Sequence, residues 1–361
     1  MRRSFASRAW VRALSFALAL PALGAESGAP PPAPGTPPER ELILLNWADY
    51  IDPDLVKAFE ARFNTRVRLV FFEGDEARES LLAKSQGRGY DLVLINGPRL
   101  DTYRRAGWLA PIAAEDVPNL RHIDPRWRET YAAEGWAVPY TWGTTGIAYR
   151  SDLVGEPIVS WKQFFQPAEA LRGKISLVKA SRDIIGSALK CLGHSLNSED
   201  PTELDAAEAL LRAQRPYVKT YTYVDLDEHS QLVTGDVAVA MMYSGDALMV
   251  KKHQPSIVYV LPEEGGGLWV DYLVVMQSSP RKKLATDFIN FLNEPENAAR
   301  LAEFLYYATP NLAAEKLLPT AFLQDPTIYP SATTLKKSEF AVPLSPRVTK
   351  RYNRIFDELT R

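Results

Sequence analysis

Two short segments of this chain place a tryptophan two residues before an aspartate. They are Trp47-Ala48-Asp49-Tyr50 and Trp269-Val270-Asp271-Tyr272. In an extended strand, residues i and i+2 point to the same side, so each segment can direct an indole and a carboxylate at one spot. This pairing suits an organic ammonium ion, because the carboxylate neutralises the charge and the ring adds a cation–π attraction of about 0.5–2 kcal/mol. A tryptophan at a strand end that merely packs in the core is the competing interpretation.

The elements expected around these segments decide between the two interpretations. Strands at 42–45, 67–72 and 91–95 alternate with helices at 54–63, 76–85 and about 100–106. A second set follows, with strands at 174–178, 237–243 and 269–275 and helices at 183–192, 203–214, 282–292, 298–304 and 347–359. This order predicts an α/β fold with parallel, doubly wound sheets, in which ligands bind beyond the carboxyl ends of strands.

Aromatic and polar residues stand at several of these strand ends. Trp47 and Asp49 follow the first strand, Asn96 follows the third, and Tyr243 and Asp246 follow residues 237–242 of a later strand. Structural roles compete with this interpretation. A tyrosine such as Tyr243 can pack at the surface of a domain, and Asp246 fits a helix N-cap. The agreement of placement and residue type favours a binding site.

Residues 1–25 are typical of a secretory signal peptide. Four arginines come before or at the start of an apolar run, and small residues at 22–25 suit cleavage. A Pro-rich stretch at 26–40 predicts an extended tether. Removing the four arginines from the 42 basic residues leaves 38 against 44 acidic ones, a net charge near −6. This charge argues against nucleic acid as a partner.

A single cysteine, Cys191, excludes an internal disulfide and lies in an apolar helical pattern. Export without disulfides fits a bacterial periplasm. The length after cleavage exceeds what one compact core usually holds, so two lobes are expected.

Enzyme signatures are mostly absent. The four histidines have no metal-ligand spacing, and the sequence has no P-loop and no G-x-S-x-G or G-x-G-x-x-G motif. The glycines at 265–267 precede a strand, which predicts a turn. A hydrolase with paired carboxylates stays open, although no pair stands out. We expect a protein that is not an enzyme and binds no cofactor and no metal.

Five segments together resemble the periplasmic spermidine/putrescine-binding proteins of bacterial ABC transporters. They are Asn46-Trp47-Ala48-Asp49-Tyr50, Tyr90-Asp91-Leu92-Val93, Pro139-Tyr140-Thr141-Trp142-Gly143-Thr144-Thr145-Gly146, Glu264-Gly265-Gly266-Gly267-Leu268-Trp269-Val270-Asp271 and Thr309-Pro310-Asn311-Leu312-Ala313-Ala314. The resemblance spans nearly the whole chain after the signal peptide. It implies the two-lobed type II fold of periplasmic binding proteins, with a doubly wound sheet in each lobe and a hinge between them. We expect residues 41–146 and 271–318 in the first lobe and residues 147–270 and 319–361 in the second.

The resemblance also implies which side chains bind the ligand. The aromatic ones are Trp47, Tyr50, Tyr243, Trp269 and Tyr307. The polar ones are Asp49, Asn96, Asp183, Asp246 and Asp271.

Three departures from the family pattern bear on the ligand. A Ser-x-Tyr motif reads Asn96-Gly97-Pro98 here, a carboxylate found in spermidine binders is Ala180, and an expected glutamine is Ala341. This chain therefore lacks part of the set of side chains expected to bind a long triamine, and a diamine fits at least as well.

The resemblance implies a monomeric receptor that binds putrescine-like diamines or spermidine, closes about a hinge and docks on a membrane permease. A receptor for another amine-bearing solute stays open, such as an amino-acid derivative, an opine or an aminophosphonate. A sensor of amines with the same fold also stays open.

Overall fold

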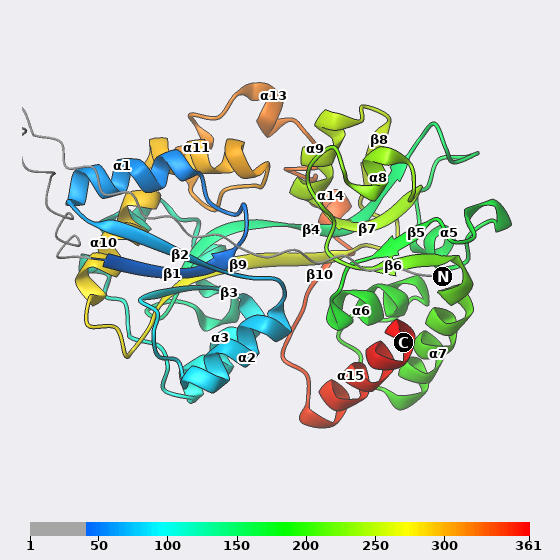
Figure 1. Ribbon diagram of the computed structural model, residues 1–361, viewed down its shortest axis with the longest axis horizontal. Coiled ribbons are helices and arrows are strands. Elements are labelled where there is room, and N and C mark those ends of the chain that lie inside the picture. Colours follow the sequence, from blue (N-terminus) through cyan, green and yellow to red (C-terminus); the bar gives the residue numbers. More distant parts are fainter. Residues whose placement is uncertain (1–40) are drawn as a thin grey trace, which may run out of the picture. The chain divides into compact units, whose positions relative to one another are not determined.

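The computed structural model describes residues 41–361, so the expected signal peptide and the whole of the expected tether lie outside the described residues. The chain starts with three parallel strands: β1 (Glu41–Trp47), β2 (Arg66–Phe72) and β3 (Leu92–Asn96). The helices α1 (Pro53–Phe63), α2 (Asp75–Ser85) and α3 (Leu100–Arg105) alternate with them. In Figure 1, α1 covers one face of these strands, and α2 and α3 cover the other. The alternation expected from the sequence is confirmed here.

Local chemistry explains where α1 begins and ends. Asp52 precedes the helix, and its side chain accepts a hydrogen bond from the Asp54 N–H at 2.8 Å. Pro53 occupies the first helical position, where its missing N–H costs nothing. Asn64 ends the helix in the left-handed conformation, with φ at 47°. These contacts fix the start of α1 shortly after the Trp47–Tyr50 segment.

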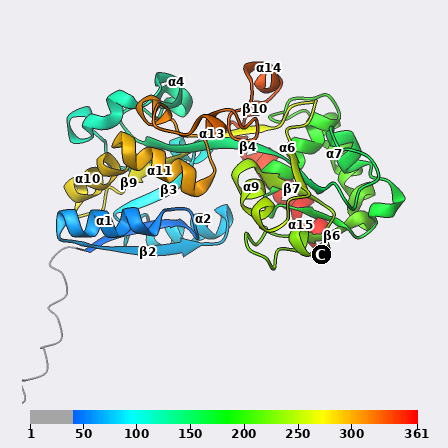
Figure 2. The same ribbon diagram turned by 90° about the horizontal axis from the view of Figure 1, so that it is seen from above.

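Two long strands connect the halves of the molecule. β9 (Gly267–Val275) runs antiparallel to both β3 and β4 (Val138–Arg150), and β4 also pairs with β7 (Val239–Tyr243) and β8 (Ile257–Val260). The strand order is β2-β1-β3-β9-β4-β7-β5-β6, so one hydrogen-bonded sheet continues through both halves. Figures 1 and 2 show β4 and β9 crossing the middle of the molecule. The α/β class is confirmed, although the sheets of the two halves are joined by these two strands.

The second half repeats the layered arrangement. β5 (Ile175–Leu177) pairs in parallel with β6 (Val218–Tyr221) and β7. Its longer helices are α6 (Ser181–Cys191), α7 (Pro201–Gln214), α9 (Ser244–His253) and α15 (Pro346–Thr360), and its shorter ones are α5 (Trp161–Phe165) and α8 (Gln231–Thr234). Figure 1 shows α6, α7 and α15 on one side of these strands and α8 and α9 on the other.

The remaining α-helices and the last strand lie before β4 or after β9. They are α4 (Pro125–Glu129), α10 (Lys282–Leu292), α11 (Pro295–Leu305), α12 (Leu312–Glu315), α13 (Thr320–Leu323), α14 (Ala332–Leu335) and β10 (Glu339–Phe340), which pairs with β9. Within residues 41–361, no helix has the length and apolar character needed to cross a membrane.

The apolar core falls into two groups of side chains. Two clusters join residues of β1, β3 and β9 with α1, α10 and α11. Two others join residues of β4, β5 and β7 with α6, α7, α9 and α15. We propose that these groups are the two lobes. Because Phe322 and Ile328 pack in the first group, we also propose that the first lobe extends to about residue 330, beyond the expected boundary at 318.

Candidate ligand-binding site

The register of the central strands aligns several candidate side chains. Asp271 on β9 lies opposite Asn96 on β3 and opposite Thr141 on β4. One step along the same face of β9, Trp269 lies opposite Gly143. A Cβ atom at Gly143 would lie 2.6 Å from the Trp269 ring, so a side chain larger than hydrogen does not fit there. The sheet thus presents a carboxylate and an indole side by side, as the W-x-D spacing predicted for this segment.

Three half-buried carboxylates each accept a hydrogen bond from a tyrosine hydroxyl. The pairs are Tyr50 with Asp271 at 3.1 Å, Tyr243 with Asp183 at 3.1 Å, and Tyr307 with Asp246 at 2.6 Å. We call these six residues the Asp–Tyr pairs. Asp246 lies in the first turn of α9 and Tyr243 precedes that helix, so Asp246 is not its N-cap.

Two of the three tyrosine rings contact Trp269, and the ring of Tyr50 contacts one of those two. The centroid of Trp269 lies 4.9 Å from that of Tyr307 and 5.9 Å from that of Tyr243, both in edge-to-face geometry. Tyr50 lies 5.9 Å from Tyr307. The indole N–H of Trp269 is buried and has no acceptor within the described residues. The result is an aromatic cluster edged by three carboxylates, which combines apolar surface for methylene groups with acceptors for ammonium ions.

Burial makes these carboxylates unusually basic. The pKa of Asp271 is raised to about 7, first by burial and then by the nearby charge of Asp75, while Arg78 and the Tyr50 hydroxyl oppose the shift. Burial also raises the pKa of Asp183 and of Asp246 to about 6 each. A carboxylate that is held away from water without a cation favours its neutral form. A bound ammonium ion would restore the charged form.

The other three candidates lie outside the Asp–Tyr pairs. Trp47 packs against Phe72 at 4.6 Å and against Tyr223 at 5.1 Å between ring centroids. The amide nitrogen of Asn96 donates a hydrogen bond to Asp75. Asp49 is exposed in the turn after β1, with φ at 53°, and lies outside the Asp–Tyr pairs.

Sequence reasoning missed four polar or aromatic side chains at the site. Thr141 shares a hydrogen bond of 2.7 Å with Tyr50, and Thr145 donates to Asp183 at 3.4 Å. Both stand in the Pro139–Gly146 motif, for which the sequence analysis predicts no strand. Tyr223 contacts Trp47, and Asp75 contacts Asn96. The position of Asp75 just after the strand at 67–72 was the available signal, by the same strand-end rule that selected Asn96.

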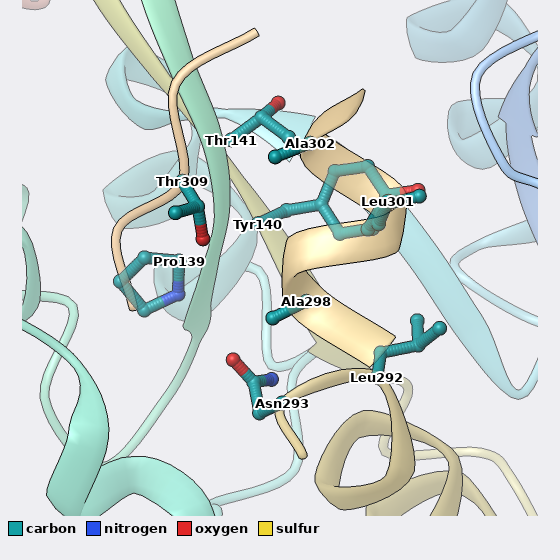
Figure 3. Close-up of a pocket in the computed structure, with 9 residues that line it drawn as sticks. All are labelled: Pro139, Tyr140, Thr141, Leu292, Asn293, Ala298, Leu301, Ala302 and Thr309. Carbon is teal, nitrogen blue, oxygen red and sulfur yellow. The ribbon is translucent and has the colours of Figure 1, made fainter. Parts of the chain in front are cut away.

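A small cavity lies behind the site, between β4 and α11 (Figure 3). Its lining includes Tyr140 and Thr141, both of which hydrogen-bond with Tyr50. The other lining residues are Pro139, Leu292, Asn293, Ala298, Leu301, Ala302 and Thr309. Because no carboxylate lines this cavity, it is not suited to an amine, and the Asp–Tyr pairs remain the candidate site.

Two lobes joined by crossing strands, with polar and aromatic side chains between them, define the class of two-lobed solute-binding proteins. Residues 54–330 match the family described as bacterial extracellular solute-binding protein, and the chain belongs to that family.

Relatives support this placement. The chain is 30% identical over 302 residues to a spermidine/putrescine-binding periplasmic protein of Escherichia coli, a match that covers 83% of this chain and 86% of that protein. It is 32% identical over 291 residues to a norspermidine sensor of Vibrio cholerae, with 80% of each chain covered.

A solved structure gives the same picture of the fold. The spermidine/putrescine ABC transporter substrate-binding protein PotD from Streptococcus pneumoniae superposes with a TM-score of 0.76 at 28% identity. The match covers 89% of this chain and 98% of that one. The expected two-lobed fold class and the family resemblance are confirmed.

Proposed function

We propose that this protein is a periplasmic receptor of an ABC importer and that it binds polyamines, with putrescine-like diamines as the preferred ligands. The observation that carries the proposal is the set of three Asp–Tyr pairs around Trp269. A diamine has an ammonium ion at each end and methylenes between them. Separate carboxylates suit the two ends, and the rings suit the methylenes.

The charge of the site favours a cation over an anion or a zwitterion. Asp271, Asp183 and Asp246 contribute three carboxylates to the cluster. The nearest cation in sequence, Arg182, is turned to Asn197 and the Val342 carbonyl, with its guanidinium over the Tyr352 ring. Among residues 41–361, these three carboxylates therefore have no direct ion pair, so an ammonium ion suits the site better than a carboxylate.

The remaining parts of the proposal follow from the family. Export through the N-terminal segment would place the receptor in the periplasm, where the ligand-bound form docks on a membrane permease. The protein acts as a monomer, because closure about a hinge needs free lobes, and it binds its ligand without chemical change.

A second candidate is a sensor, in which the closed form reports amine levels to a membrane protein. The similarity to the norspermidine sensor of Vibrio cholerae favours it. The two roles share the ligand site and differ in the partner. Uptake of labelled putrescine by cells with and without this protein separates them, because only an import receptor changes the uptake rate.

The first test is a thermal-shift screen of the mature protein with putrescine, cadaverine, spermidine, norspermidine, agmatine, γ-aminobutyrate and common amino acids. A tight ligand raises the melting temperature by mass action. We expect the largest shift with a diamine. Shifts with amino acids alone would contradict the proposed ligand class.

Asp271→Asn tests the site itself. Removing the charge should weaken diamine binding by about 2–5 kcal/mol, because a desolvated ammonium ion loses its partner. The matched control is Glu115→Gln, at an exposed carboxylate outside the cluster. Isothermal titration calorimetry measures both, and unchanged affinity in Asp271→Asn would refute the assignment.

A further inference from the structure

Asp75, which sequence analysis did not select, sits in a polar network at the edge of the site. It is the first residue of α2, and its Oδ1 atom lies 2.9 Å from the Arg78 guanidinium. Its Oδ2 atom accepts a hydrogen bond from the Asn96 amide nitrogen. The preceding Gly74 faces Tyr223, since a Cβ atom at Gly74 would lie 3.4 Å from that ring. The start of α2 therefore lies against the second lobe, on the side of the binding site.

Arg78 is a rigid support for Asp75. Its side chain is 1% exposed, and it is also 3.4 Å from a Glu79 oxygen and 3.3 Å from the Tyr103 hydroxyl. Its guanidinium lies over the Phe72 ring at 5.3 Å. A buried guanidinium with this many partners has little freedom to move, and it holds the Asp75 carboxylate in one orientation.

The orientation of Asp75 fixes that of Asn96. Because the amide nitrogen of Asn96 is turned toward Asp75, its amide oxygen is turned away from that carboxylate. This oxygen is buried and accepts no hydrogen bond from the described residues. Asn96 lies opposite Asp271 in the β3–β9 register, so the free oxygen and the Asp271 carboxylate belong to neighbouring positions on one face of the sheet. An N–H group of a bound ligand can supply the donor that this buried oxygen lacks.

We propose that Asp75 is a positioning residue that acts through Asn96, and that the Asn96 oxygen and the Asp271 carboxylate together accept the N–H groups of a primary ammonium ion. This inference rests on the proposed function and specifies the ligand further. A primary ammonium ion has three N–H donors, whereas a protonated dimethylamino group has one. The network therefore selects ligands with a terminal primary amine over their N-methylated derivatives.

A purely structural role is the competing explanation, because Arg78 needs anionic partners wherever it is buried. The chain offers a matched pair of variants. Asp75→Asn and Glu79→Gln each remove one carboxylate from Arg78, but only Asp75 contacts Asn96. A structural role predicts similar effects of the two variants, and those effects would not depend on the ligand.

The test compares the dissociation constants for putrescine and N,N,N′,N′-tetramethylputrescine by isothermal titration calorimetry. We expect Asp75→Asn to reduce the preference for putrescine by about tenfold or more, the size of a lost hydrogen bond to a charged group. Glu79→Gln should keep the preference of the unmodified protein. Asn96→Ala, which leaves the ion pair of Arg78 with Asp75 in place, should lose the preference as well, and adding Asp75→Asn to it should change little further.

Each outcome separates this inference from the proposed function. If the unmodified protein binds putrescine but Asp75→Asn and Asn96→Ala keep its preference, the inference is wrong and the proposed function stands. Equal changes in Asp75→Asn and Glu79→Gln would also overturn the inference. If the unmodified protein binds no amine, both the proposed function and the inference fail.

Discussion

Asp49 and Asp271 show how far a residue pattern predicts a site. Both stand two residues after a tryptophan, but the rule that i and i+2 share a side holds only within a strand. β9 continues through Asp271, so Trp269 and Asp271 lie on one face, as predicted. β1 ends at Trp47, and Asp49 falls in a turn with positive φ. The end of a strand cannot be read from the sequence to within two residues. That uncertainty is large enough to decide whether a residue such as Asp49 points into the site.

The raised pKa values of the same carboxyl groups predict a pH dependence of stability. Asp271 at about 7 and Asp183 and Asp246 at about 6 lie above the value of about 3.9 for an unfolded aspartate. Between these values the folded protein binds more protons than the unfolded chain, so its stability falls as the pH rises from about 4 to 7. Melting curves at pH 5, 6, 7 and 8 should show this decline without ligand. Asp271→Asn should make the decline shallower, and an equally steep curve in that variant would contradict the assignment.

At the scale of elements, most strands and helices were predictable and β4 was not. The helices around 54–63, 203–214 and 282–292 have clear apolar periodicity, and the structure contains them. β4 includes Pro139, Gly143 and Gly146, residue types that usually mark turns. These glycines are explained by close neighbours, since a Cβ atom at Gly146 would lie 2.4 Å from the Val260 carbonyl oxygen. Tertiary contacts thus determine that this segment forms a strand, and local residue propensities do not predict it.

Gly143 on β4 gives a prediction at this scale. A methyl group there would press on the Trp269 ring and on the Ser244 hydroxyl, 2.6 and 2.9 Å away. We expect Gly143→Ala to displace the indole, to weaken diamine binding at least tenfold and to lower stability by about 1–3 kcal/mol. Gly155→Ala is the control, because a Cβ atom at Gly155 has no neighbour within 4 Å in the described part of the chain. Titration calorimetry and urea unfolding measure the two effects, and equal behaviour of the two variants would argue against a tight fit at Trp269.

For the whole molecule, the site draws on both proposed lobes. Tyr307 of the first lobe binds Asp246 of the second, and Trp47 of the first contacts Tyr223 of the second. β4 and β9 run through both lobes and form the connection about which they could move. The class of the fold was predictable from the order of elements and the family motifs. The pairing of particular side chains across the lobes was not predictable, because residues 47 and 223 are brought together only by the path of the whole chain.

This arrangement predicts that the ligand and the contact of Trp47 with Tyr223 both favour the closed form. A ligand shifts a conformational equilibrium only by binding one form better, and the Tyr307–Asp246 pair, which spans the two proposed lobes, forms only when the lobes meet. Small-angle X-ray scattering should show a smaller radius of gyration with putrescine than without it. Tyr223→Ala should enlarge the ligand-free molecule and weaken binding, because closure then loses a ring contact of about 0.5–1.5 kcal/mol. Tyr217→Ala, which removes a ring that packs on Arg172 instead, should leave both measurements unchanged. A radius that does not respond to putrescine would contradict hinge closure, since the two lobes would then be fixed in one arrangement.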